Sequence, residues 1–119
     1  FVPDMLEKKK GHVVFISSVS ANQPHPYGGI YAASKTALEV IAETLRQETL
    51  PTVKVTVVSP GIVETDFFKN EVSGATSIEE IGMGSISAEE IAEDVWYALS
   101  KKNGTCINKI LTRPVLQTF

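Results

Sequence analysis

A tyrosine and a lysine, Tyr31 and Lys35, lie four residues apart in the first third of the sequence. On a helix this spacing puts a phenol and an ammonium on the same face, within reach of one ligand. A phenol ordinarily titrates near pH ~10, too high for efficient proton transfer at neutral pH, and a neighbouring ammonium lowers that value. The pair is a candidate for acid-base catalysis, although an ordinary surface pair can have the same spacing.

Two further candidates follow segments that have the composition of buried strands. Ser18 comes directly after an apolar run, 12–16, and the turn Pro60-Gly61 ends a run rich in β-branched residues, 53–59. In an open α/β sheet, ligands bind at the carboxyl ends of the strands. We therefore expect Ser18 and this turn to lie at the same edge of the sheet as Tyr31.

The elements that must position these residues alternate between helix and strand. Periodicity and breakers predict a helix that ends before residue 11, strands at 12–16, 53–59 and 106–111, and helices at about 30–49 and 88–100. The last helix should begin with a capping box between Ser87 and Glu90. Residues 68–86 are predicted to form a mobile loop with at most a short helical piece. This order is typical of an α/β fold with a parallel sheet and crossover helices.

The composition excludes several other kinds of protein. A net charge of −3, with one short lysine run at 8–10, gives no basic surface for nucleic acid. The apolar runs are too short to span a membrane. One cysteine and two histidines make an internal disulfide impossible and a structural zinc site unfavourable, so we expect no metal and a cytoplasmic setting.

Three segments in a fixed order resemble one enzyme family. Gly11 to Ser18, Tyr31 to Lys35 and Pro60 to Thr65 are similar to the C-terminal half of the classical short-chain dehydrogenases/reductases. The resemblance covers almost the whole chain. It implies that residues 1–119 are the C-terminal catalytic part of a single Rossmann-type domain with a doubly wound parallel sheet. The Gly-rich dinucleotide turn and the asparagine of the catalytic set cannot be placed in this sequence. The first helix also looks cut, so the N-terminal dinucleotide-binding half is expected to be absent and these residues alone to be inactive.

The resemblance implies a role for each of the three catalytic candidates. Tyr31 corresponds to the general acid or base that exchanges a proton with the substrate oxygen. Lys35 corresponds to the lysine that tunes this phenol and binds the nicotinamide ribose. Ser18 corresponds to the hydroxyl that orients and polarises the substrate carbonyl.

The resemblance also implies that the turn after the second strand faces the cofactor. Pro60 and Gly61 would let the backbone pass close to it, and the main chain of Val63 would face the carboxamide. Thr65 would donate a hydrogen bond to the carboxamide or to a phosphate. Cofactor-binding residues are therefore expected to be Tyr31 and Lys35 together with this turn.

The end of the chain carries a finer resemblance. Segments 90–97 and 107–115 are similar to the NADP-dependent 3-hydroxy acid (serine or allo-threonine) dehydrogenases, and a branch acting on isoprenoid or steroid alcohols has a similar tail. This implies NADP, with NAD as the alternative, and a small alcohol or carbonyl substrate. In such proteins the helix after Tyr31 packs across a two-fold axis, which implies a homotetramer or homodimer.

Two functions from different classes follow from these observations. The first is an NAD(P)-dependent oxidoreductase that transfers hydride between a nicotinamide and a secondary alcohol or carbonyl. The alternative is a truncated, non-catalytic interaction or regulatory module of the same fold. Such a module has no physical need for Ser18, Tyr31 and Lys35 together, so their presence favours the enzyme.

Overall fold

The computed structural model describes residues 1–66 and 76–119, so residues 68–75 of the region predicted to be a mobile loop lie outside the described residues. The elements in chain order are α1 (Val2–Glu7), β1 (Gly11–Ile16), the 3-10 turn η1 (Val19–Ala21), α2 (Gly29–Glu48), β2 (Val53–Pro60), α3 (Ile78–Ile81), α4 (Ala88–Leu99) and β3 (Lys109–Thr112). The single turn of α3 is the short helical piece that the sequence predicts.

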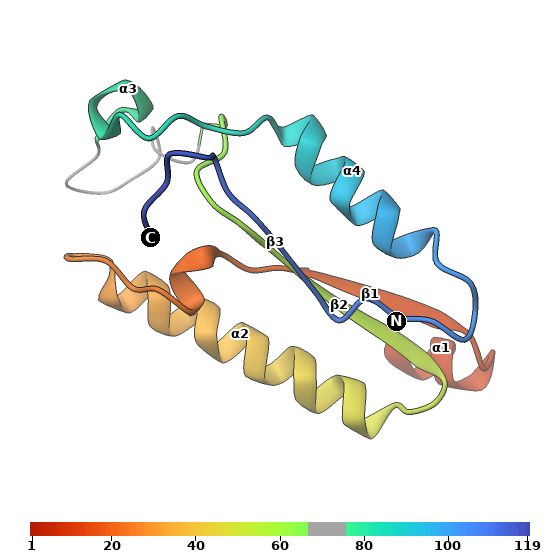
Figure 1. Cartoon of the computed structure of the whole chain (residues 1–119). Helices are drawn as coiled ribbons and strands as arrows, with labels where there is room; N and C mark the ends of the chain where they lie inside the picture. The colour runs from red at the N-terminus through yellow and green to blue at the C-terminus, as the bar shows by residue number, and fades with distance from the viewer. Residues whose placement is uncertain (67–75) are drawn as a thin grey trace.

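The three strands form one parallel sheet in the order β1-β2-β3. Val13 pairs with Val55, and Val58 pairs with Ile110, so β2 is the central strand among the described residues. Figure 1 shows α2 and α4 on opposite sides of this sheet. Each connects two parallel strands, and the predicted α/β fold class with crossover helices is confirmed.

Two apolar clusters hold the helices to the two faces of β2. On the α2 side, Ala42 packs with Val55 and Val57. On the α4 side, Val58 packs with Ile91 and with Ile86 from the preceding loop. Burying a valine side chain contributes roughly 1.5–3 kcal/mol, so these contacts fix the helices relative to the sheet. The density of β-branched residues in β2 agrees with its burial on both faces.

The start of α4 agrees with the sequence, and the start of β3 does not. Ser87 accepts a hydrogen bond from the backbone of Glu90, whose carboxylate accepts one from the backbone of Ser87, as the predicted capping box requires. The predicted strand at 106–111 begins only at Lys109. Before Lys109, the carbonyl of Val55 accepts a hydrogen bond from the side chain of Cys106, at 3.4 Å. This side-chain bond replaces the backbone hydrogen bond between strands that the prediction requires.

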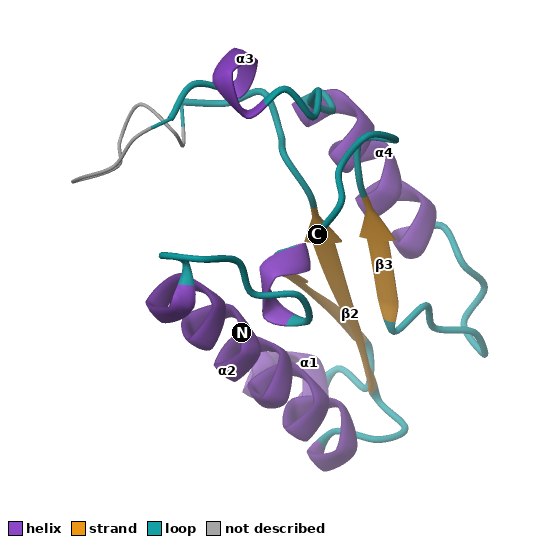
Figure 2. Ribbon diagram, turned by 60° about the vertical axis from the view of Figure 1, so that its left-hand side comes forward, coloured by secondary structure: helices purple, strands orange, loops and turns teal. Residues whose placement is uncertain are grey.

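The carboxyl ends of the strands point to one edge, where the connecting segments gather (Figure 2). The segment with η1, the turn after β2 and the C-terminal residues after β3 all follow strand ends there. Among the described residues, no helix is both long enough and apolar enough to cross a membrane.

Candidate active site

Lys35 connects the face of α2 that carries Tyr31 to the end of β1. Its Nζ donates a hydrogen bond to the carbonyl oxygen of Ile16, at 3.1 Å, and lies 5.8 Å from the centroid of the Tyr31 ring. Both side chains are partly buried. The spacing of one helical turn therefore brings the ammonium close to the phenol, as the sequence predicts, and holds both near the carboxyl edge of the sheet.

Ser18 lies two residues beyond the carbonyl that binds Lys35, and its side chain is buried. Its Oγ accepts a hydrogen bond from the backbone of Ser20, at 3.2 Å, and so caps η1. A serine hydroxyl that accepts one bond still has its proton to donate. Thr36 on α2 donates to the carbonyl of Ala21 at 2.9 Å, which holds η1 against the helix. The structure thus brings Ser18, Tyr31 and Lys35 to one edge of the fold.

The turn after β2 is held in an extended form by the segment before α4. Ile86 donates to the carbonyl of Ile62 and accepts from the backbone of Glu64, both at 2.9 Å. These bonds flank Val63, whose own N–H and C=O point to the opposite side because backbone groups alternate along an extended chain. The main chain of Val63 is therefore directed away from Ile86, and the hydroxyl-bearing Thr65 follows on the exposed surface.

The turn begins with a close approach of two backbones. Pro60 is buried as the last residue of β2, and Gly61 donates to the carbonyl of Thr112 at 2.7 Å. A Cβ on Gly61 would lie 2.1 Å from Oε1 of Gln117, so no larger residue fits there without moving that side chain. The close neighbour of Gly61 in the structure is thus the protein's own Gln117, and the approach of this turn to a cofactor stays a prediction.

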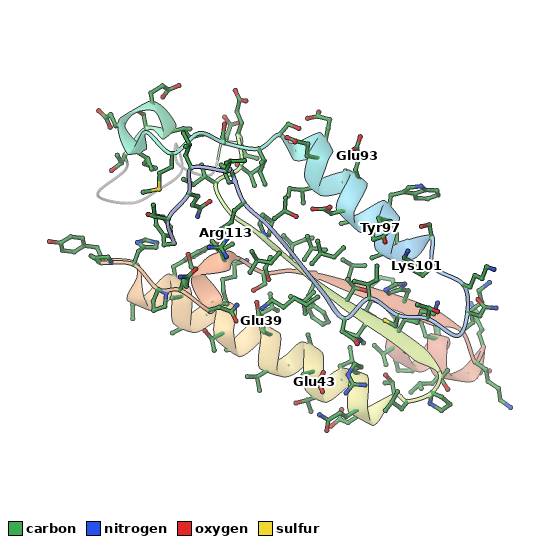
Figure 3. All side chains as sticks on the ribbon, viewed as in Figure 1. Glu39, Glu43, Glu93, Tyr97, Lys101 and Arg113 are labelled. Carbon is green, nitrogen blue, oxygen red and sulfur yellow. The ribbon has the colours of Figure 1, made fainter. Side chains whose placement is uncertain are left out.

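A partly buried carboxylate, Glu39, lies one helical turn after Lys35 on α2 and was not predicted from the sequence (Figure 3). It accepts hydrogen bonds from Ser17 Oγ at 2.9 Å and Ser59 Oγ at 3.0 Å, and forms a salt bridge with Lys109 Nζ at 2.6 Å. These partners come from β2, β3 and the end of β1. Glu39 follows Lys35 by one helical turn, and this spacing is the only local signal that could have suggested it.

Opposing effects determine the charge state of Glu39. Burial raises the pKa of its carboxyl, but the hydrogen bonds from Lys109, Ser17 and Ser59 and the charge of Lys109 outweigh burial, so the pKa lies below its usual value. A carboxylate whose folded pKa is lowered stabilises the protein above the unfolded pKa. This stabilisation is lost as the pH falls through the folded value.

Glu39→Gln is expected to lower the free energy of unfolding by about 1.5–3 kcal/mol at pH 7, the worth of hydrogen bonds to a charged group. The difference from the unsubstituted protein should shrink as the pH falls from the unfolded pKa, about 4.3, through the lowered folded pKa of Glu39, because protonation then removes the charge that the substitution also removes. Glu43→Gln is the matched control on the same helix. The pKa of Glu43 is lowered to about 2 by hydrogen bonds from Arg46, but this pair is exposed and screened by solvent.

Urea unfolding of the intact protein at pH 7 and at lower pH measures these effects. The hydrogen bonds of Glu39 would be shown not to stabilise the protein by either of two results. One is an equal decrease in the free energy of unfolding for Glu39→Gln and Glu43→Gln, and the other is a decrease for Glu39→Gln that does not depend on pH.

Comparison with known proteins gives consistent matches. A family model described as short chain dehydrogenase matches residues 1–76. An uncharacterized oxidoreductase of Staphylococcus epidermidis is 32% identical over 115 residues, which cover 96% of this chain and 47% of the relative. The 11-beta-hydroxysteroid dehydrogenase-like 3 of Arabidopsis thaliana is 44% identical over 88 residues, which cover 74% of this chain and 27% of the relative.

Solved structures resemble the fold over nearly its whole length. The closed form of a serine dehydrogenase complexed with NADP+ superposes with a TM-score of 0.86 at 28% identity, covering 99% of this chain and 50% of the other. A serine dehydrogenase from Escherichia coli gives a TM-score of 0.80 at 26% identity, with 99% and 46% coverage. The chain spans about half the length of these enzymes and of the staphylococcal relative.

Proposed function

Because this chain belongs to the short-chain dehydrogenase family, we propose that it provides the catalytic side of an NADP-dependent oxidoreductase acting on a secondary alcohol or carbonyl compound. The observation that carries the proposal is the hydrogen bond from Lys35 to the carbonyl of Ile16. This bond joins the helix face that carries Tyr31 to the end of β1, which leads into Ser18. The side chains of Ser18, Tyr31 and Lys35 therefore lie at one edge of the sheet, where they can bind a substrate oxygen and exchange a proton with it.

Each of the three side chains has a separate task in this proposal. Tyr31 exchanges the proton with the substrate oxygen as general acid or base. Ser18, whose hydroxyl proton is available, donates to that oxygen and stabilises the charge that develops on it. Lys35 places its positive charge beside the phenol, where it stabilises the negative charge that develops on the phenol oxygen as the proton moves.

The turn after β2 fits a nicotinamide cofactor. Gly61 brings its backbone close to neighbouring chain segments, and the N–H and C=O of Val63 point away from Ile86, where a carboxamide can bind both. Pro60 and Thr65 complete the cofactor-facing turn, and Tyr31 and Lys35 bind the nicotinamide ribose. When bound, the cofactor exchanges hydride with the substrate carbon. We favour NADP over NAD because a similar serine dehydrogenase binds NADP+.

We propose 3-hydroxy acids as the substrate class. The support is the likeness to the serine dehydrogenases, which extends over 99% of this chain. The enzyme and oxidoreductase names of the relatives give no support to the alternative of a non-catalytic interaction module.

We also propose that residues 1–119 are the catalytic part of one longer Rossmann-type domain. Among the described residues β1 pairs only with β2, which leaves its other edge available to a further strand. A homotetramer or homodimer is proposed because α2 exposes the apolar residues Val40 and Ile41. A cytoplasmic location is proposed because Cys106 has no second cysteine with which to form a disulfide.

The proposed function is tested with the intact protein, meaning the longer protein of which residues 1–119 are proposed to be a part. Reduction of NADP is followed with a panel of 3-hydroxy acids, simple secondary alcohols and steroid alcohols. We expect the highest kcat/KM for a 3-hydroxy acid. Turnover of another alcohol class alone would reject the substrate class and keep the oxidoreductase, whereas no turnover of any alcohol or of the matching carbonyl compounds would reject both.

Ser18→Ala in the same assay is expected to lower kcat by about 10- to 100-fold, for a hydrogen bond to a charged oxygen worth roughly 1.5–3 kcal/mol. Affinity for NADP should stay unchanged, since Ser18 is assigned to the substrate. Ser34→Ala is the matched control because its hydroxyl donates to the carbonyl of Tyr31 at 2.7 Å, within the helix, and is exposed. A kcat for Ser18→Ala equal to that of the control would reject the assigned role.

A further inference from the structure

The residues after β3 contact both segments that border the candidate site. Arg113 Nη1 donates to Oε1 of Gln23 at 2.9 Å, and the ring of Phe119 lies 5.1 Å from the ring of His25, centroid to centroid. Figure 3 shows Arg113 beside the segment that follows β1. Gln23 and His25 belong to the loop between Ser18 and Tyr31. One side of the C-terminal segment therefore contacts this catalytic loop.

The other side of the same segment contacts the turn after β2 through Gln117. This side chain is 8% exposed, and its Oε1 accepts a hydrogen bond from the buried backbone N–H of Ile62 at 2.9 Å. Gln117 in turn donates its own backbone N–H to the carbonyl of Pro114, at 3.0 Å. This backbone hydrogen bond closes a turn between Pro114 and Gln117, which places the Gln117 side chain against the turn after β2.

Gln117 supplies a side-chain hydrogen bond to this turn, whereas the neighbouring amides are bound by main-chain carbonyls. The N–H of Gly61 is bound by the carbonyl of Thr112, and that of Glu64 by the carbonyl of Ile86. Both neighbours are therefore fixed by the sheet and by the segment before α4. Ile62 depends on a residue 55 positions away in sequence, and an unsatisfied buried N–H would cost about 1–3 kcal/mol.

The nitrogen of the Gln117 amide is also enclosed by the protein. Its Nε2 is buried and has no acceptor among the described residues, although buried donors are normally paired. Replacing Gly61 by any residue with a Cβ would displace this amide, so the glycine and the glutamine are matched in shape. The bond from Ile62 to Oε1 is therefore the described polar contact that holds this amide against the turn.

We propose that Gln117 is a positioning residue that fixes the backbone of the turn 60–65 and thereby sets the place of the nicotinamide end of the cofactor. This inference rests on the proposed function for the ligand and on the described contacts for the turn. Gln117 acts through Ile62 and the main chain of Val63 and touches neither the proton nor the hydride. The C-terminal segment is accordingly part of the site and more than a covering of the fold.

The test compares Gln117→Met, which keeps the volume and removes the acceptor, with Gln23→Met, which removes the other polar contact of the same segment. The first readout is amide hydrogen exchange in the intact, cofactor-free protein. We expect Gln117→Met to speed exchange at Ile62 by about tenfold while Gly61 and Glu64 stay protected, and Gln23→Met to leave all three unchanged. Unchanged exchange at Ile62, or equal loss of protection at all three amides, would overturn the proposal.

The second readout separates the two ends of the cofactor. We expect Gln117→Met to weaken binding of NADP by about tenfold and to leave binding of 2′,5′-ADP, which lacks the nicotinamide, unchanged. Equal weakening of both ligands, or of neither, would overturn the role assigned to Gln117. An unsubstituted protein that binds neither ligand would instead contradict the proposed function, so the two failures are distinguishable.

Discussion

Replacing Tyr31 with phenylalanine is expected to lower kcat of the intact protein by about 10²–10⁴-fold, the usual contribution of general acid-base catalysis. The ring stays in place, so its packing and the nearby ammonium of Lys35, 5.8 Å from the centroid, are retained. The substitution removes the phenol hydroxyl, and with it the transferable proton and one hydrogen bond to the nicotinamide ribose. The dissociation constant of NADP should therefore rise by no more than about tenfold, the worth of one hydrogen bond, and the larger loss should fall on kcat.

Tyr97→Phe is the matched control for this substitution. Tyr97 lies on α4, half-exposed, with Lys101 Nζ 3.8 Å from its ring centroid, and thus has a lysine neighbour like that of Tyr31. Its substitution should leave kcat unchanged. Near-normal turnover by Tyr31→Phe, or an equal loss in the two variants, would contradict the assignment of Tyr31 as proton donor and acceptor.

Lys35→Ala is expected to lower kcat/KM by about 10²–10⁴-fold, because the ammonium is assigned two tasks that each amount to about 10- to 100-fold. Loss of its charge beside the phenol should lower kcat, and loss of its hydrogen bonds to the nicotinamide ribose should raise the dissociation constant of NADP. Stopped-flow turnover together with calorimetric titration of NADP measures the two effects separately.

The controls for Lys35 address charge and fold. Lys8→Ala removes an exposed ammonium near the start of the sequence and should change neither kcat nor the dissociation constant of NADP. The bond from Lys35 to Ile16 O is one hydrogen bond from a charged group, worth about 1.5–3 kcal/mol at most, so the variant should remain folded, which urea unfolding checks. A folded Lys35→Ala protein with normal turnover and normal NADP affinity would reject both tasks.

The elements that carry local signals were predictable from the sequence. The helix bearing Tyr31 begins and ends within a residue of its predicted bounds, since a stripe of apolar residues fixes its inner face and Pro51 follows it. The capping box at Ser87 uses only two side chains three residues apart. The candidate site residues were likewise found from short motifs whose order along the chain determines the edge they share.

The contacts that support the site were not predictable, because they join distant parts of the chain. Glu39 and Lys109 are 70 positions apart, and Gln117 is 55 from Ile62. Neither Glu39 nor Gln117 belongs to a local sequence pattern that would indicate its partner. The late start of β3 has the same origin, since a bond from the Cys106 side chain to Val55 depends on the sheet already being formed.

The central claim is that Ser18 and Tyr31 act as one unit on the same substrate oxygen. The most direct measurement is kcat of the double variant Ser18→Ala/Tyr31→Phe compared with the two single variants. Residues that act as a unit have strongly non-additive effects, so we predict that the double variant is within about threefold of Tyr31→Phe alone. Losses that multiply in the double variant would show that the two side chains act independently, and would contradict the account.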